Sequence, residues 1–311
     1  MRKTRGHRIR MRPPTATDAQ VAAQLAVPFD PHRTALYTAR ELYDAEPYAD
    51  SLDARTYAWS REPVRPEGAL AMVLHDGAID AALTSWIQGR SLVGVMGGHA
   101  VERGQPAYDD TARLGHLLGA THVVATGGGP GAMEAANLGA RLAGLPAETV
   151  AEASRILAGV PGFRPSIDGW VARAQQVCER FPSDRPSLGV PTWFYGHEPS
   201  NLFATAIAKY FRNALREAIL LQICGAGIVF MEGVGGTVQE VFQDACENYY
   251  ADEADVAPMV LVGRRYWTET LPAWPLLQAL AKGRAMESHI HLVDSVDEAA
   301  DVLGQLAMRS D

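Results

Sequence analysis

The chain has 311 residues, of which 47% are hydrophobic and 21% are charged, and its formal net charge is −8. This composition is typical of a globular protein, and the negative charge argues against a nucleic-acid-binding protein, which would usually carry a basic face. No run of about 18 apolar residues is present, so we expect no transmembrane helix and no membrane partner. The three cysteines have no CxxC spacing, which argues against a disulfide framework and a zinc site. We therefore expect a cytoplasmic protein that needs neither a metal nor a cofactor.

Residues 1–88 are predicted to form an N-terminal extension that is mostly helical. Its basic tail, Met1 to Arg12, is followed by no apolar segment, so we expect neither a signal peptide nor a membrane anchor there. Residues 18–25 and 33–45 are typical of helices, and strands do not alternate with helices in this region. We expect the extension to pack on the main domain.

Residues 89–311 are predicted to form the nucleotide-binding domain, because short β-rich apolar segments alternate here with helical ones. The predicted strands are residues 92–96, 123–125, 188–194, 228–231, 259–262 and 290–293. The predicted helices are residues 108–118, 132–143, 202–222, 238–249 and 296–306. This alternation indicates an α/β protein with a Rossmann-like doubly wound parallel sheet and helices on both faces. Ligands of such sheets bind at the carboxyl edge.

A helical insertion at about residues 144–186 is predicted to interrupt this alternation. About 45 residues separate the helix at 132–143 from the strand that begins at Leu188, too many for an ordinary loop. Residues 148–158 and 169–181 are typical of helices. We expect this insertion near the rim of the binding site.

Glycines gather where three predicted strands turn into helices. They are Gly97 and Gly98 after the first strand, Gly127, Gly128, Gly129 and Gly131 after the second, and Gly233, Gly235 and Gly236 after the strand at 228–231. Glycine lets the backbone approach a ligand closely, and the start of the following helix favours phosphate. The dinucleotide pattern is matched only loosely, without an acidic residue at a strand end, and the lysine of the Walker motif is absent. The loops therefore predict a phosphorylated ligand, but not a kinase or an ATPase.

Thr237 and Glu240 have two interpretations. Thr237 is expected at or near a helix start, where its hydroxyl and the N–H groups of Gly235 and Gly236 would face a phosphate. Glu240 either completes a Thr-x-x-Glu capping box or lies beside the sugar, where a carboxylate could orient water or stabilise an oxocarbenium-like transition state. The spacing supports both interpretations equally.

Lys209, Arg212 and Arg216 lie on one face of the predicted helix at 202–222. Such a stripe is usually a solvated face, but this one precedes the strand of the last glycine loop, and phosphate needs a cation. In a single continuous helix the early turns would lie nearest the site, which favours Lys209 or Arg212. A break in the helix would favour Arg216 instead.

The two longer glycine clusters resemble the motifs of the LOG family, the "lysine decarboxylase-like" Rossmann proteins that include phosphoribohydrolases and nucleotide 5′-monophosphate nucleosidases. The segment from Gly127 to Met133 is similar to the family's GGGxxGxM loop, one residue shorter, and the segment from Glu232 to Glu240 is similar to its PGGxGTxxE loop. Residues 198–201 resemble a Glu-Pro-x-Asn segment of the longer nucleosidase members. The chain, a divergent longer member, has Glu232 instead of proline and Val234 instead of the second glycine.

The resemblance implies that Arg216 and Glu240 form the catalytic pair, with Arg212 as the second choice of arginine. It implies that the glycine loops, Met133 and Thr237 bind a nucleoside 5′-monophosphate, with its 5′-phosphate held by the loops and Thr237. The N-glycosidic bond would be hydrolysed to free base and ribose 5-phosphate without a metal. It also implies a homodimer or larger homo-oligomer, with the helices at 202–222 and 238–249 as a possible interface.

Two other functions remain open from the sequence. One is a nucleotide-binding module without catalysis, such as a sensor or carrier, because a carboxylate at Glu232 could repel phosphate or change the loop. The other, a dinucleotide-dependent oxidoreductase, is disfavoured because no acidic residue lies at the required strand end.

Overall fold

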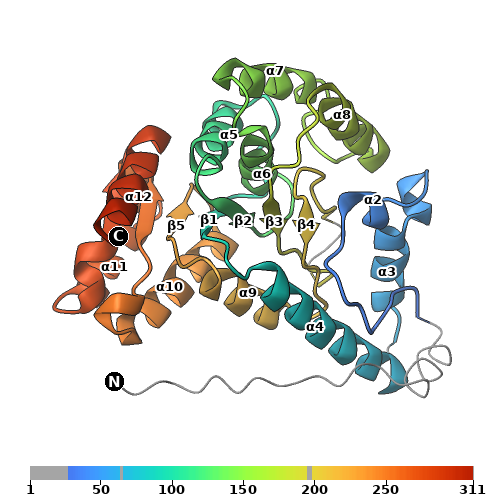
Figure 1. Ribbon diagram of the computed structural model, residues 1–311, viewed down its shortest axis with the longest axis horizontal. Helices are drawn as coiled ribbons and strands as arrows, with labels where there is room; N and C mark the ends of the chain where they lie inside the picture. Colours follow the sequence, from blue (N-terminus) through green and yellow to red (C-terminus); the bar gives the residue numbers. More distant parts are fainter. Residues whose placement is uncertain (1–26, 64–65, 195–197, 311) are drawn as a thin grey trace.

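The computed structural model describes residues 27–63, 66–194 and 198–310, and its centre is a seven-stranded parallel sheet (Figure 1). The strands are β1 (Leu92–Met96), β2 (Val123–Thr126), β3 (Ser187–Gly189), β4 (Ala206–Ile207), β5 (Ile228–Phe230), β6 (Met259–Val262) and β7 (Ile290–Val293). Their order is β4-β3-β2-β1-β5-β6-β7, and all six pairings are parallel. The predicted fold class, a Rossmann-like doubly wound sheet, is confirmed.

The strand order reverses at β1. The chain runs outward through β2, β3 and β4 and then returns to form β5 on the other side of β1. The register pairs Val93 with Val124 of β2, and Val95 with Val229 of β5. A crevice forms outside the carboxyl ends of parallel strands where the order reverses. The sheet therefore places the ends of β1, β2 and β5 side by side, and a glycine loop follows each of them.

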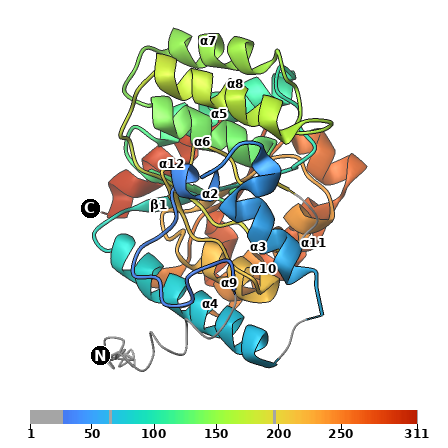
Figure 2. The same ribbon diagram turned by 90° about the vertical axis from the view of Figure 1, so that its right-hand side faces the viewer.

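Helices cover both faces of the sheet (Figures 1 and 2). The α-helices are α2 (Ala39–Leu42), α3 (Leu52–Ser60), α4 (Pro66–Trp86), α5 (Pro106–Leu118), α6 (Ala132–Leu142), α7 (Ala147–Leu157), α8 (Ile167–Arg180), α9 (Asn213–Gln222), α10 (Gly235–Tyr250), α11 (Ala273–Ala281) and α12 (Val296–Ser310). Shorter turns are the 3-10 helices Tyr48–Asp50, Glu253–Asp255 and Ala285–His289 and the π-helix Tyr266–Thr270.

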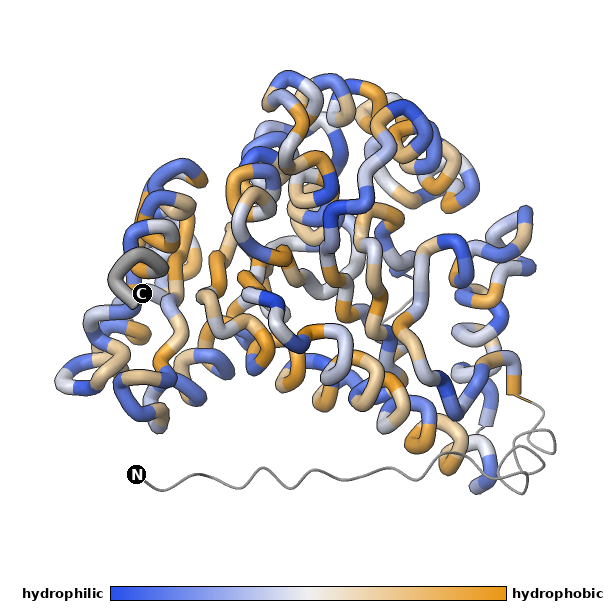
Figure 3. The backbone as a smooth tube through the Cα atoms, in the orientation of Figure 1, coloured by the Kyte–Doolittle hydropathy of each residue, from blue (hydrophilic) through white to orange (hydrophobic). Residues whose placement is uncertain are grey.

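Alternate residues of each strand face different helices. Val93 and Val95 of β1 pack with α5, α6 and α12, whereas Leu92 and Met96 pack with α4, α9, α10 and α11. Because helices cover both faces, all residues of β1, β2 and β6 are buried and apolar residues run through the strands without polar alternation. Figure 3 shows the strands as mostly orange segments inside a layer of helices of mixed hydropathy.

The predicted helix at residues 202–222 is wrong in its first half. Ala206 and Ile207 form β4 against β3, and Ile207 also makes an antiparallel bridge to Tyr37. The α-helix begins only at Asn213. Tertiary pairing with a neighbouring strand therefore overrides the local helical pattern.

Two other predicted boundaries also change. The predicted helix at 33–45 is reduced to the four residues of α2, and the predicted strand at 188–194 ends at Gly189. The insertion forms α7 and α8, and α7 packs on α5. The basic tail and the predicted helix at 18–25 lie outside the described residues, and the domain boundary at residues 88 and 89 stays a prediction.

The contact between α5 and α6 depends on glycine. A Cβ at Gly139 of α6 would overlap the carbonyl oxygen of Ala112 on α5. We expect Gly139→Ala to push the two helices apart and to lower the free energy of unfolding by about 1–3 kcal/mol, measured by urea denaturation. Gly77→Ala on α4 is the control, because nothing lies within 4 Å of its added Cβ. We expect that control to be neutral or stabilising by up to about 1 kcal/mol, and equal unfolding midpoints for the two variants would contradict the prediction.

Candidate functional site

A cavity of about 200 Å³ lies where the glycine loops after β1 and β5 meet the start of α6. Its lining residues are Gly97, Gly98, His99, Met133, Glu198, Arg216, Glu217, Val234, Gly236, Thr237 and Glu240. The structure thus brings predicted residues from all three loop regions together with Arg216. His99, Glu198 and Glu217 were not predicted as site residues. Only Glu198 had a signal in the sequence, its place in the Glu-Pro-x-Asn segment.

Gly127 leaves the space that Arg216 occupies. A Cβ at Gly127 would lie 2.7 Å from Nη2 of Arg216 and 2.7 Å from Sδ of Met133. Both contacts are shorter than side chains tolerate, so a larger residue at position 127 would displace the arginine. The glycine loop after β2 and helix α9 are therefore complementary in shape.

Asn201 holds the same loop from its buried side. Its backbone N–H donates to the carbonyl of Gly128 at 2.9 Å, and its Nδ2 donates to the carbonyl of Gly129 at 3.1 Å and to Oδ1 of Asn137 at 3.0 Å. These bonds fix the position of the chain that carries Glu198 to the rim of the cavity.

The glycine loop after β5 leads directly into α10. The helix begins at Gly235 with Val234 as its N-cap residue, so Thr237 is the third residue of the helix. The capping-box interpretation of Thr237 is therefore wrong. The first N–H groups of a helix have no partner within it, and Gly236 and Thr237 line the cavity. A Cβ at Gly233 would overlap the hydroxyl of Thr237, which explains a glycine there.

The remaining predicted glycines lie around this cavity rather than in its lining. Gly235 is exposed at the start of α10, and Gly131 lines a neighbouring cavity beside the start of α6. Gly128 and Gly129 face Asn201 through their carbonyl groups.

Arg216 lies in the first turn of α9 and is buried. Its Nε donates to the carbonyl of Val190 at 2.8 Å. Its Nη1 lies 2.5 Å from Oε2 of Glu217 and 3.7 Å from Oε1 of Glu240. The contact with Glu217 lacks the angles of a hydrogen bond, so Nη1 donates to no acceptor within the described residues. The guanidinium is thus fixed on one side and free to donate on the other.

Burial raises the pKa of Glu240 to about 8, and the charge of Glu217 acts in the same direction while Arg216 opposes it. The carboxyl group is therefore largely protonated at neutral pH. One turn further along α10, burial also raises the pKa of Asp244 to about 8. A buried carboxyl with a pKa near neutrality is suited to general acid–base chemistry.

The break before α9 separates the three basic residues that the sequence grouped together. Lys209 is buried away from the cavity, with its Nζ 2.5 Å from Oδ1 of Asp53 and 3.0 Å from Oγ of Ser200. Arg212 is the exposed N-cap residue of α9 and does not line the cavity. The predicted placement of all three on one helical face is wrong, and Arg216 alone of the three lines the cavity.

The two departures from the family motif have different surroundings. The carboxylate of Glu232 lies against Gly263, where a Cβ on that glycine would be 3.0 Å from its Oε1, and Glu232 does not line the cavity. Val234 does line it and is 66% exposed. The negative charge of Glu232 therefore lies beside the end of β6 rather than at the start of α10.

Within the described ranges, no three His, Cys, Asp or Glu side chains are grouped as metal ligands would be. In the same part of the chain, no helix combines the length and the apolar character needed to cross a membrane.

Three solved structures are similar to this chain at 16–18% identity. The molybdenum cofactor binding protein from the phototrophic bacterium Rippkaea orientalis is 16% identical over 71% of this chain and 99% of its own, with a TM-score of 0.43. Two structures of the Moco carrier protein from Chlamydomonas reinhardtii are 17% and 18% identical over 71% and 70% of this chain and 99% of their own, with TM-scores of 0.44 and 0.43. No family model and no curated protein matches the chain. Membership of the LOG family stays a prediction.

The raised pKa of Glu240 predicts how stability depends on pH. This carboxyl titrates near 4.5 in the unfolded chain and near 8 in the folded one. Between these values the folded protein holds the extra proton, so the free energy of unfolding falls as the pH rises from about 5 to about 8. Glu240→Gln carries no titrating group, and we expect it to reduce this fall by on the order of a few kcal/mol.

Urea denaturation at several pH values would measure the effect, with Glu148→Gln at the exposed start of α7 as the control. We expect that control to keep the wild-type pH dependence. An unchanged pH dependence in Glu240→Gln would mean that the carboxyl titrates normally in the folded protein.

Proposed function

We propose that the protein binds a nucleoside 5′-monophosphate and hydrolyses its N-glycosidic bond, releasing the free base and ribose 5-phosphate. The observation that carries this proposal is the pairing of buried Arg216 and Glu240, 3.7 Å apart, in a cavity that opens on the start of α10. The glycine loops after β1 and β2 approach the same place. This combination supplies phosphate donors and an acid–base group within one cavity.

The phosphate would lie at the start of α10. The N–H groups of the first helical turn and the helix dipole favour an anion there, and the hydroxyl of Thr237 adds a donor. The Nη1 donor of Arg216 lies in the same cavity. Phosphate binding would therefore give a hydrogen-bond acceptor to a guanidinium nitrogen that has none within the described residues.

Glu240 would supply the proton for the reaction. Water adds to C1′ of the ribose, the bond from C1′ to the base nitrogen breaks, and its electron pair leaves with the base. Protonated Glu240 can donate a proton to the departing base, and its carboxylate can then accept the proton that the water loses. A pKa near the working pH makes both forms accessible, and Arg216 keeps that pKa from rising further.

Binding without hydrolysis is the second candidate, and one observation favours it. Enzymes that cleave glycosidic bonds commonly use two carboxyl groups in separate roles. Here the second buried carboxylate, Glu217, lies 2.5 Å from Arg216 and is engaged by it. A site with a single available carboxyl group could hold a phosphorylated ligand without changing it.

Chromatography of wild-type protein incubated with a panel of nucleoside monophosphates would test for release of free base. We expect Glu240→Gln to slow release about 10²- to 10⁴-fold while nucleotide binding persists. We expect Arg216→Met to weaken binding itself, because a buried cation that meets the phosphate is lost. Glu148→Gln is again the control and should retain full release.

Release that is absent from every nucleotide would overturn the hydrolase proposal. Tight binding without release, unaffected by Glu240→Gln, would establish the second candidate instead. A parallel binding measurement with molybdenum cofactor, the ligand named for the similar structures, would show whether the site takes that compound instead. Binding of none of these compounds would contradict both candidates.

We also propose that α9 and α10 form an interface between copies of the chain. Leu215 and Ile219 of α9 and Phe242 of α10 are only partly buried, and Tyr250 at the end of α10 is 84% exposed. We expect sedimentation velocity to give twice the chain mass of 33.5 kDa, and Tyr250→Arg to shift the protein toward monomer. A wild-type protein that remains monomeric at all concentrations would contradict this proposal.

A further inference from the structure

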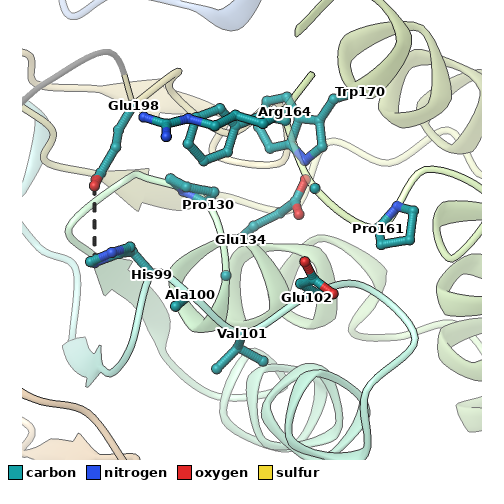
Figure 4. A pocket seen from close by; sticks show the side chains of 13 residues that line it. His99, Ala100, Val101, Glu102, Pro130, Glu134, Pro161, Arg164, Trp170 and Glu198 are labelled. Carbon is teal, nitrogen blue, oxygen red and sulfur yellow. Dashed lines mark ion pairs between the residues drawn. The ribbon is translucent and has the colours of Figure 1, made fainter. Parts of the chain in front are cut away.

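A second cavity of about 340 Å³ adjoins the first and shares His99 and Glu198 with it (Figure 4). These two side chains face each other, with Nδ1 of His99 3.9 Å from Oε1 of Glu198. The second cavity continues past them toward the helical insertion. A ligand held at Arg216 and Glu240 could therefore extend past His99 and Glu198 into this space.

The insertion builds one wall of the second cavity, and a buried arginine fixes that wall. Arg103 donates through Nε and Nη2 to the carboxylate of Glu134, and through Nη1 to the carbonyl of Trp170 at 3.1 Å. Its guanidinium also lies 4.6 Å from the centre of the Trp170 ring. Because Arg103 and Glu134 are almost fully buried, they neutralise each other and leave no charge for a ligand. The wall is therefore preformed.

The remaining lining suits a nucleobase better than a phosphate. Pro130 and Phe163 supply flat apolar surface, while Arg164 and Glu102 supply a donor group and an acceptor group. Figure 4 shows Arg164 and Glu102 on opposite sides of the cavity. The carboxylate of Glu102, which lines this cavity and not the first one, would repel a phosphate. A flat ring with hydrogen-bond acceptors on one edge and donors on another would match this arrangement.

We propose that this cavity receives the base of the nucleotide and selects a 6-oxopurine, the class that contains guanine and hypoxanthine. The inference rests on the proposed binding of a nucleoside monophosphate in the first cavity. A guanidinium binds O6 and N7 of such a base with two hydrogen bonds, and a carboxylate accepts from N–H groups of the base. Arg164 fills the first role and Glu102 the second, at the N1–H edge. Adenine has an amino group in place of O6 and no hydrogen on N1, and pyrimidines have no N7.

Isothermal titration calorimetry with GMP, IMP, AMP and UMP would test the proposal in the Glu240→Gln background, in which the nucleotides stay intact. We expect GMP and IMP to bind at least about tenfold more tightly than AMP and UMP. Arg164→Ala should remove most of this preference by weakening GMP and IMP, with little change for AMP. Arg173→Ala is the matched control, since this arginine belongs to the same insertion, bonds to Gln176 and lines neither cavity.

The outcomes separate this inference from the proposed function. Binding that depends on Arg216 but is equal for the four bases, or a preference that survives Arg164→Ala, would overturn the base cavity and leave the proposed function in place. Loss of the preference in Arg173→Ala as well would assign it to the fold of the insertion and also overturn the role of Arg164. Binding of none of the four nucleotides would overturn both.

Discussion

The buried guanidinium of Arg216 is the interaction on which the site depends. It bonds to Val190 beyond β3, contacts Glu217 and Glu240, and occupies the space above Gly127. A buried cation is costly unless carboxylates and carbonyls surround it. The segment after β3, helices α9 and α10 and the glycine loop after β2 are therefore constrained together. A change in one glycine loop therefore reaches the other through this side chain.

Helices α3 and α4, which precede β1, also help to position Arg216. Asp76 on α4 accepts hydrogen bonds from the N–H groups of Phe211 and Arg212 at 3.0 and 3.1 Å. These bonds fix the chain just before α9 and so determine that Arg216 falls in the first turn of the helix. On the neighbouring side, Asp53 of α3 holds buried Lys209. Two carboxylates on α3 and α4 therefore set the path of the chain that leads to Arg216.

The parallel sheet and the glycine loops could be predicted because their signals are local. Each of β1, β6 and β7 matches its apolar segment residue for residue. The break before α9 could not be predicted, because Ala206 and Ile207 are strand residues only through pairing with β3 and Tyr37. Glu217 follows Arg216 directly in the sequence, but its contact with Nη1 of that arginine depends on side-chain directions, which no sequence pattern indicates. Arg103 and Glu134 are 31 residues apart and carry no motif.

The charges in the first cavity raise the question of how it could accept an anion at all. The carboxyl groups of Glu198, Glu217 and Glu240 line it together with the guanidinium of Arg216. Glu217 is neutralised by Arg216, and Glu240 is largely protonated at neutral pH because burial raises its pKa to about 8. The positive end of the α10 dipole is then opposed mainly by the negative charge of Glu198, which lies at the rim of the cavity beside His99. Under the proposed function, burial of Glu240 would therefore do two things: it would provide a proton for the reaction and remove the negative charge that would otherwise repel a phosphate.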